Sequence, residues 1–200
     1  MAVDDTNVQR RRILLAVTTG VGGVGVVSTA LPFLESMGPS EAAKAAGAPV
    51  EVDVSKVGPG KLQTVEWRGR PIWVLHRTQE MLATLGNHNG ALLDPNSDQP
   101  QQPPYAKNQY RSIKPEYLIL VGICTHLGCI PLFRPQPGAA EIGPNWPGGF
   151  YCPCHGSLFD LAGRVFKNVP APLNLEVPAY EYLSDTRLLI GEDKKKPKSA

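Results

Sequence analysis

The chain has 200 residues, an ordinary size for a single globular domain. Its charge is nearly balanced, with 20 Lys and Arg residues against 18 Asp and Glu residues, and this composition argues against a nucleic-acid-binding protein. Gly and Pro each number 20. Their combined share is well above average usage, which favours a loop-rich, mostly β protein over a helical bundle.

The N-terminal part of the chain contains a long uncharged segment. Residues 13–34, ILLAVTTGVGGVGVVSTALPFL, hold no charged side chain, and a helix of this length spans roughly 33 Å, close to the thickness of a bilayer core. Three arginines at residues 10–12 precede it, and such a positive flank stays on the cytoplasmic side. We therefore expect a cytoplasmic N-terminus over residues 1–12 and one transmembrane anchor over residues 13–35.

The arginines followed by a Gly-rich apolar run also resemble a bacterial twin-arginine export signal. A cleaved signal peptide is one alternative, because Ala46-Gly47-Ala48 has the small-residue pattern of a cleavage site, although it lies well beyond the apolar run. A buried core helix is another, but it would not need the leading arginines. A retained anchor predicts a single-pass protein of the bacterial inner membrane with its head domain in the periplasm.

Residues 36–49, SMGPSEAAKAAGAP, are small, polar and rich in Ala. We interpret them as a hinge or tether, either flexible or a short helix that melts readily. Beyond it, alternating and β-rich residues predict strands over residues 50–54, 62–67 and 72–75, with a turn-like break at residues 68–71.

Residues 78–85, TQEMLATL, predict one helix in the soluble part, with Thr78 as N-cap and Glu80 in the first turn. The Asn-, Pro- and Gln-rich residues 86–110 follow, and we expect them to form a surface loop. The apolar run at residues 117–123 predicts a strand that leads to the first group of cysteines.

The remaining segments complete one head domain. A Pro- and Gly-rich loop is expected at residues 135–149, and a last strand at residues 188–190. The lysines beyond Glu192 predict a solvated end. The head therefore covers residues 50–191, and a charged tail covers residues 192–200.

Two short segments hold all four cysteines and two of the four histidines of the chain. The first is C-x-H-x-x-C at residues 124–129, and the second is C-x-C-H at residues 152–155. The six residues are Cys124, His126, Cys129, Cys152, Cys154 and His155.

Four interpretations of these segments compete. Purely structural cysteines and core histidines would not concentrate in this way. A structural zinc site uses the same ligand types, but it commonly pairs Cys with Cys and His with His, whereas each segment here mixes them. Plain disulfides would leave both histidines without a role.

A [2Fe–2S] cluster is the interpretation that uses every residue. If Cys124 and Cys152 bind one iron and His126 and His155 bind the other, each segment supplies one ligand of each type. Neutral imidazoles in place of two thiolates raise the reduction potential to roughly −150 to +300 mV, against about −400 mV for all-Cys ferredoxins. The other two cysteines would then be able to join the segments by a disulfide in an oxidising compartment.

CTHLGC and CPCHGS resemble the two cluster-binding segments of Rieske iron–sulfur proteins, specifically those of the ubiquinol–cytochrome c reductase or cytochrome bc1 complex. The resemblance covers nearly the whole chain and includes Val169-Pro170-Ala171-Pro172, which is similar to the family's Pro-rich loop. Rieske ferredoxins and oxygenases lack the two additional cysteines. The resemblance implies a mostly β fold, with a Rieske-type antiparallel β-sandwich head, a cluster-binding subdomain at about residues 118–172, and a single N-terminal transmembrane helix.

Carried over by position, the resemblance implies that Cys124 and Cys152 bind the buried iron of one Rieske [2Fe–2S] cluster. His126 and His155 would bind the outer iron. It also implies a disulfide between the remaining pair, Cys129 and Cys154.

The resemblance assigns further roles close to the cluster. His155 and Leu127 would contact the quinol, and Ser157 would donate its hydroxyl to a bridging sulfide. The family often has Tyr where this chain has Phe159; loss of that donor predicts a potential lower by roughly 20–60 mV. The residues expected in the surroundings of the cluster are Gly128, Ser157, Phe159 and Pro170.

The implied function is electron transfer from ubiquinol to cytochrome c1, with proton release to the periplasm, in a respiratory or photosynthetic chain. Cytochrome b and cytochrome c1 would be the partners in a dimeric complex, and nucleic acid is not expected as a partner. The alternative is the small Rieske subunit of a periplasmic molybdenum oxidase of the arsenite-oxidase type. A stand-alone Rieske carrier is disfavoured by the anchor and the additional cysteines, and the motifs leave open a thylakoid-type subunit that feeds cytochrome f.

Overall fold

The computed structural model describes residues 5–192 of the chain. These residues fall into two units that divide between Ala45 and Ala46. The first unit is helical, and the second is the β-rich head. Except for Glu192, the predicted charged tail lies outside the described residues.

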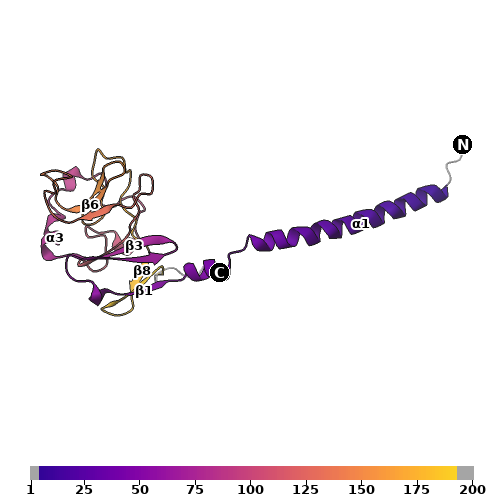
Figure 1. The fold of residues 1–200 in the computed structure, drawn as a ribbon, viewed down its shortest axis with the longest axis horizontal. Helices are drawn as coiled ribbons and strands as arrows, with labels where there is room; N and C mark the ends of the chain where they lie inside the picture. Colours follow the sequence, from indigo (N-terminus) through magenta and orange to yellow (C-terminus); the bar gives the residue numbers. More distant parts are fainter. Residues whose placement is uncertain (1–4, 193–200) are drawn as a thin grey trace. The chain divides into compact units, whose positions relative to one another are not determined.

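The first unit is dominated by α1 (Asp5–Ser36), a single continuous helix (Figure 1). Its length and composition suffice to cross a membrane. The hydroxyls of Thr18 and Thr29 donate to the carbonyls of Leu14 and Gly25, four residues earlier, at 2.5 and 2.6 Å. These two hydroxyl groups are therefore satisfied within the helix, as is favourable in a segment that could lie in lipid.

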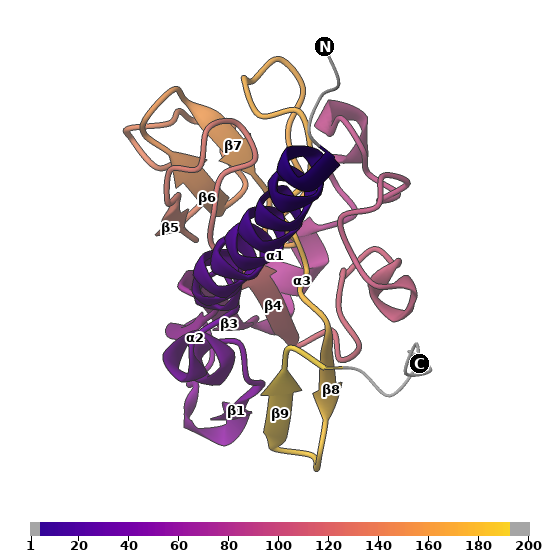
Figure 2. The ribbon, with the colours of Figure 1, turned by 90° about the vertical axis from the view of Figure 1, so that its right-hand side faces the viewer.

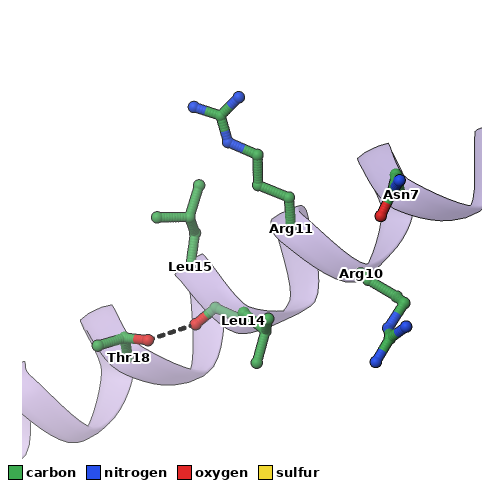
Figure 3. Close-up of a pocket in the computed structure, with 6 residues that line it drawn as sticks. All are labelled: Asn7, Arg10, Arg11, Leu14, Leu15 and Thr18. Atoms are coloured by element: carbon green, nitrogen blue, oxygen red, sulfur yellow. Dashed lines mark hydrogen bonds between the residues drawn. The ribbon is translucent and has the colours of Figure 1, made fainter. Parts of the chain in front are cut away.

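The basic start of α1 changes to apolar residues within two turns (Figure 3). Arg10 and Arg11 project from the helix in different directions, and Leu14 and Leu15 follow one turn later. The helix thus begins at Asp5, earlier than the predicted anchor, and the residues that join this start to the apolar run, Gln9 and the three arginines, are good helix formers.

A short second helix, α2 (Glu41–Ala46), lies in the predicted tether. The hydroxyl of Ser40 accepts a hydrogen bond from the backbone N–H of Ala43 at 3.2 Å and thereby caps the helix. An isolated helix of this length is marginal in water.

The head contains three antiparallel sheets of three strands each (Figure 2). The first has the order β1 (Val50–Asp53), β9 (Arg187–Ile190), β8 (Tyr180–Tyr182), the second β2 (Leu62–Trp67), β3 (Arg70–His76), β4 (Tyr117–Val121), and the third β5 (Leu132–Arg134), β6 (Gly149–Cys152), β7 (Ser157–Phe159). A 3₁₀ turn, η1 (Val54–Lys56), follows β1.

The second sheet delivers the chain to the first cysteine segment. A two-residue turn of Arg68 and Gly69, both at positive φ, joins β2 to β3 and matches the twist of the strands. Residues 72–75 of the central strand β3 are all buried, which explains their continuous apolar run. Strand β4 pairs with β3 from Tyr117 to Val121 and ends three residues before Cys124.

The third sheet positions the second cysteine segment. Phe150 of β6 pairs with Phe133 of β5 and with Phe159 of β7. Cys152 ends β6 and pairs with Ser157. The ring of Phe150 stacks on Trp73 of β3, with centroids 4.9 Å apart, so that the second and third sheets share one core.

Helix α3 (Gln79–Thr84) lies where the sequence predicts it. The hydroxyl of its N-cap, Thr78, accepts from the N–H of Met81 at 3.3 Å. The following segment, expected as a surface loop, instead reaches into the core. It contains the 3₁₀ turns η2 (Asn89–Ala91) and η3 (Pro104–Ala106), and it buries Leu92, Ser97 and Ala106.

Four strands were not predicted: β5, β6, β7 and β8. Each has three or four residues, which is too short for alternation of polar and apolar residues to be recognised. Three of them, β5, β6 and β7, form the third sheet, so the sheet that supports the second cysteine segment became visible only in the folded chain.

Candidate metal centre

The loop after β4 begins with Cys124, which is only 3% exposed. Its N–H donates to the carbonyl of Cys129 at 2.7 Å, and its carbonyl accepts from the N–H of Gly128 at 3.1 Å. Gly128 has φ +85°, a value that favours glycine. The loop is therefore a tight turn that buries its first cysteine.

The loop after β6 repeats this turn. Cys152 is 2% exposed, and its carbonyl accepts from the N–H of Gly156, four residues later, at 2.9 Å. Gly156 has φ +78°. Both loops thus begin with a buried cysteine and close on a glycine in the left-handed region.

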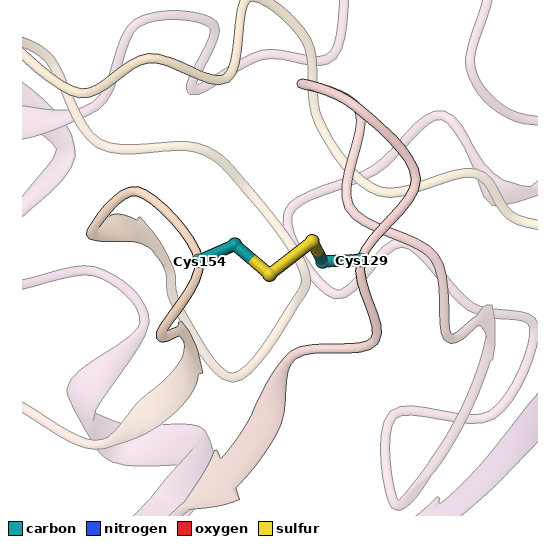
Figure 4. The surroundings of a disulfide bond; sticks show 2 residues. All are labelled: Cys129 and Cys154. Carbon is teal, nitrogen blue, oxygen red and sulfur yellow. A yellow bond between two sulfur atoms is a disulfide. The ribbon is translucent and has the colours of Figure 1, made fainter.

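A disulfide joins the two loops (Figure 4). It connects Cys129 to Cys154, with the Cα atoms 6.7 Å apart. The sulfurs of Cys129, Cys152 and Cys154 lie within 4.8 Å of one another. Two of these sulfurs share the disulfide and offer no thiolate, so the three residues do not form a metal site of their own.

Cys124 and Cys152 are left as free thiols, both buried. Burial raises the pKa of the Cys152 thiol, and a hydrogen bond with the Cys124 thiol raises that pKa further. A pair of buried thiols gains its anionic form when a metal binds, because coordination deprotonates a thiol outright. The two sulfurs therefore fit one side of an iron–sulfur cluster.

The imidazoles of the two segments lie together on the outer side. The rings of His126 and His155 meet edge to face with centroids 4.8 Å apart. His155 is exposed and His126 is half-buried. The donor set is thus two thiols inside and two imidazoles outside, the two types that a mixed Cys and His [2Fe–2S] site requires.

A third loop, residues 169–173, is tied to both cysteine loops. The hydroxyl of Thr125 donates to the carbonyl of Leu173 at 2.6 Å. The hydroxyl oxygen of Ser157 accepts from the N–H of Ala171 at 3.0 Å, which leaves the hydroxyl hydrogen of Ser157 available to another acceptor. Ala171 is buried and Pro170 is exposed.

The comparisons with known proteins agree with this geometry. Residues 105–181 match the family model of the Rieske [2Fe-2S] domain, and residues 1–40 match that of the Ubiquitinol-cytochrome C reductase Fe-S subunit TAT signal. The ubiquinol-cytochrome c reductase iron-sulfur subunit of Allochromatium vinosum is 58% identical over 97% of this chain and 94% of its own length. The chain belongs to this family of Rieske iron–sulfur subunits.

A second bacterial relative gives the same result, and a solved structure resembles part of the chain. The iron-sulfur subunit of Blastochloris viridis is 42% identical over 96% of this chain and 98% of its own length. A chain of a solved structure, a hyperthermophilic respiratory Complex III, is 28% identical and covers 88% of this chain and 98% of its own, with a TM-score of 0.47. The cofactor of this Rieske subunit is a [2Fe–2S] cluster, as its matched domain implies.

The first cysteine segment of this Rieske subunit and the residues directly after it expose apolar side chains. Leu127 is 72% exposed and Ile130 is 57% exposed, and Leu132 is also among the exposed apolar residues. Of these three, only Leu127 was predicted to have a role at the site. Ile130 and Leu132 were missed because an apolar residue beside a strand is usually assigned to the core.

Phe159 lies two residues beyond Ser157 on β7 and is fully buried. It pairs with Phe150 across the third sheet. Apolar packing therefore surrounds the position where the family often has Tyr.

Sequence reasoning also missed a group of buried charges in the head. Asp160, Arg164, Arg77 and Arg111 are all at most 2% exposed. They were missed because charged residues are ordinarily assigned to the surface. The one signal in the sequence is that Asp160 and Arg164 lie four residues apart with Gly163 between them, a pattern that could indicate a structured turn.

Proposed function

We propose that this Rieske subunit oxidises ubiquinol and passes one electron on to cytochrome c1 in a ubiquinol–cytochrome c reductase. The observation that carries the proposal is the placement of buried thiols inside and paired imidazoles outside, at a surface that also exposes Leu127 and Ile130. Such a surface can receive an apolar quinone ring and present a histidine to its hydroxyl.

The proposed ligands are Cys124 and Cys152 for the inner iron and His126 and His155 for the outer iron. Burial of the thiols and exposure of His155 support this assignment. The disulfide between Cys129 and Cys154 limits the distance between the two ligand loops, because it joins them covalently.

The residues of the chain have distinct tasks in quinol oxidation. When bound, the cluster supplies a one-electron acceptor. The exposed imidazole of His155 accepts a hydrogen bond from the quinol hydroxyl and takes its proton at the ring nitrogen. Leu127 contacts the quinone ring and excludes water, and Ser157 offers its hydroxyl hydrogen to the cluster.

The anchor defines the proposed topology. Residues 1–12 lie in the cytoplasm, residues 13–35 cross the inner membrane, and residues 36–49 tether the periplasmic head of residues 50–191, whose cluster-binding part covers residues 118–172. Protons then leave to the periplasm. The partners are cytochrome b and cytochrome c1 in a dimeric complex, with the tether carrying the head between them.

The first test is low-temperature EPR of ascorbate-reduced membranes that contain the full-length chain. We expect a Rieske signal that changes with a quinol-site inhibitor, and its loss in Cys124→Ser and His155→Ala. Thr125→Ser is the matched control, because it changes a residue of the same loop, retains the hydroxyl that bonds Leu173 and removes no proposed ligand. A spectrum without this signal, together with stoichiometric zinc, would contradict the ligand assignment.

The second test separates the two kinds of complex. The proposal predicts that the chain co-purifies with b- and c-type haem. Co-purification with molybdenum would instead identify the subunit of a molybdenum oxidase.

A third test concerns the tether. Two prolines introduced between Ala42 and Ala46 should slow turnover while the EPR signal remains, since they stiffen the tether.

A further inference from the structure

The turn at residues 160–164 directly follows β7 and is organised by a buried carboxylate. Oδ1 of Asp160 accepts from the N–H groups of Ala162 and Arg164 at 2.9 and 2.8 Å. Oδ2 accepts from Nε of Arg164 at 2.8 Å, and Nε2 of His88 lies 3.3 Å away. These contacts hold the pKa of Asp160 below its ordinary value despite burial, which opposes them, so the group is an anion.

The guanidinium of Arg164 extends from this turn to the segment after α3. It donates to the carbonyl of Leu85 at 2.6 Å, to Oδ1 of Asn89 at 3.0 Å and to the carbonyl of Pro95 at 3.2 Å. Residues 85–95 therefore supply hydrogen-bond acceptors to Arg164, which follows the last strand of the third sheet.

Two further buried arginines bind the backbone of the same turn. Arg111 donates to the carbonyls of Ala162 and Gly163 at 3.2 and 3.3 Å. Arg77 donates to the carbonyl of Leu161 at 3.1 Å. We refer to Arg77, Arg111 and Arg164 as the arginine triad.

The triad leaves an excess of positive charge in the interior. Among the described residues, the fully buried charges are the three guanidiniums and the single carboxylate of Asp160. Burial lowers the pKa of Arg77 and of Arg111 to about 10, so both remain charged at neutral pH. Asp94 and Glu116, the other carboxylates that act on these arginines, are half-buried.

The turn is joined to the segments that carry all three loops of the proposed metal centre. It begins three residues after Ser157, which corresponds to about 10 Å of extended chain. The carbonyl of Gly163 accepts from Leu175 at 2.8 Å, just beyond the Pro-rich loop. Gly163 also packs against Leu120 of β4, since a Cβ there would lie 2.8 Å from Cδ1 of that leucine.

We propose that the arginine triad raises the reduction potential of the [2Fe–2S] cluster by electrostatic stabilisation of the added electron. Reduction adds one negative charge, and a buried positive charge is weakly screened in the low-dielectric interior. Net charge near an iron–sulfur cluster is one of the factors that set its potential. The inference rests on the proposed function only in that the cluster binds between these loops.

The test is a redox titration of the Rieske EPR signal in membranes that contain the full-length chain. Arg77→Gln removes a buried positive charge and should lower the midpoint potential, whereas Asp160→Asn removes the buried negative charge and should raise it. A role in positioning alone gives no reason for shifts of opposite sign. Arg77→Lys retains the charge but loses hydrogen bonds, so it should keep the potential while it lowers thermal stability.

Two more variants complete the design. Gln102→Glu replaces an amide by a carboxylate of nearly the same shape. Oε1 of Gln102 accepts from Arg111 at 3.0 Å, so the new negative charge lies beside the triad. The variant should lower the potential without creating a buried cavity. Arg68→Gln changes an exposed arginine and should produce no shift, because solvent and salt screen it.

The outcomes separate this inference from the proposed function. If the wild-type chain gives no Rieske signal, the ligand assignment itself is wrong. If the wild type gives the signal but Gln102→Glu leaves the potential unchanged, the electrostatic role of the triad is wrong. Shifts of the same sign in Arg77→Gln and Asp160→Asn would contradict it as well.

Discussion

The loop after β4 and the loop after β6 share one backbone turn but depend on different surroundings. In each, a buried cysteine accepts through its carbonyl from a glycine four residues later, at 3.1 Å in the first loop and 2.9 Å in the second. The first loop is tied to the Pro-rich loop by Thr125. The second continues into β7 and then into the turn at residues 160–164, whose backbone Arg77 and Arg111 bind.

This difference separates two requirements of the metal centre. The first loop supplies the exposed apolar surface, with Leu127 at its end. The second is rigidly joined to buried charges and presents the exposed His155. Contact with a substrate and adjustment of the potential can therefore be assigned to different sides of one site, and substitutions can test them separately.

The largest effect is expected from the disulfide that joins the loops. Cys129→Ser releases a loop closed over a sequence separation of 25 residues, which should destabilise the oxidised protein by about 3 kcal/mol through the entropy of the unfolded chain. The measurement is the temperature at which the visible circular dichroism of the cluster is lost. The double variant Cys129→Ser, Cys154→Ser should lose the cluster signal at the same temperature as the single variant. A further decrease in that temperature would show that each cysteine also contributes to stability independently of the disulfide.

The two glycines that close the turns form a matched pair. Alanine at Gly128 or Gly156 meets no neighbouring atom within 4 Å but must adopt positive φ, which costs roughly 1–2 kcal/mol. We expect similar destabilisation from Gly128→Ala and Gly156→Ala in thermal unfolding. Gly90→Ala, at an open position without positive φ, is the control, and a loss as large there would refute the argument from φ.

A smaller effect is expected from the bond between the first loop and the Pro-rich loop. Thr125→Val keeps the shape of the side chain but leaves the carbonyl of Leu173 without its 2.6 Å donor, at a cost of about 1 kcal/mol. Thr125→Ser retains the hydroxyl and should stay close to wild type. Equal stability of the Val and Ser variants would mean that the bond contributes nothing measurable.

The smallest change concerns the second loop. Phe159→Tyr adds a hydroxyl to a fully buried ring on β7 and should raise the midpoint potential by roughly 20–60 mV if it donates to a cluster ligand. Phe166→Tyr, at a half-buried ring, is the control and should not shift it. A potential that stays constant or falls in Phe159→Tyr would contradict the prediction.

Much of the site could be predicted from local sequence. The spacing of Cys and His in two segments indicated the cluster, and the uncharged run after three arginines indicated the anchor, since both signals depend on neighbouring residues. The cap at Thr78 was likewise a local signal, confirmed by its bond to Met81. The strand of Ser157, Leu158 and Phe159 gave no such signal, because three residues cannot display a period.

The sequence by itself determined the family, the cofactor class, the long apolar helix and the residues proposed to bind iron. Only the tertiary structure decided that parts of residues 86–110 enter the core, and that Arg77 and Arg111 bind the turn that holds Asp160 and Arg164. The physical reason is that a buried charge is stabilised by carbonyls and carboxylates from distant segments, such as Arg77 by Leu161. Such partners meet only in the folded chain, whereas a ligand motif is written along a few consecutive residues.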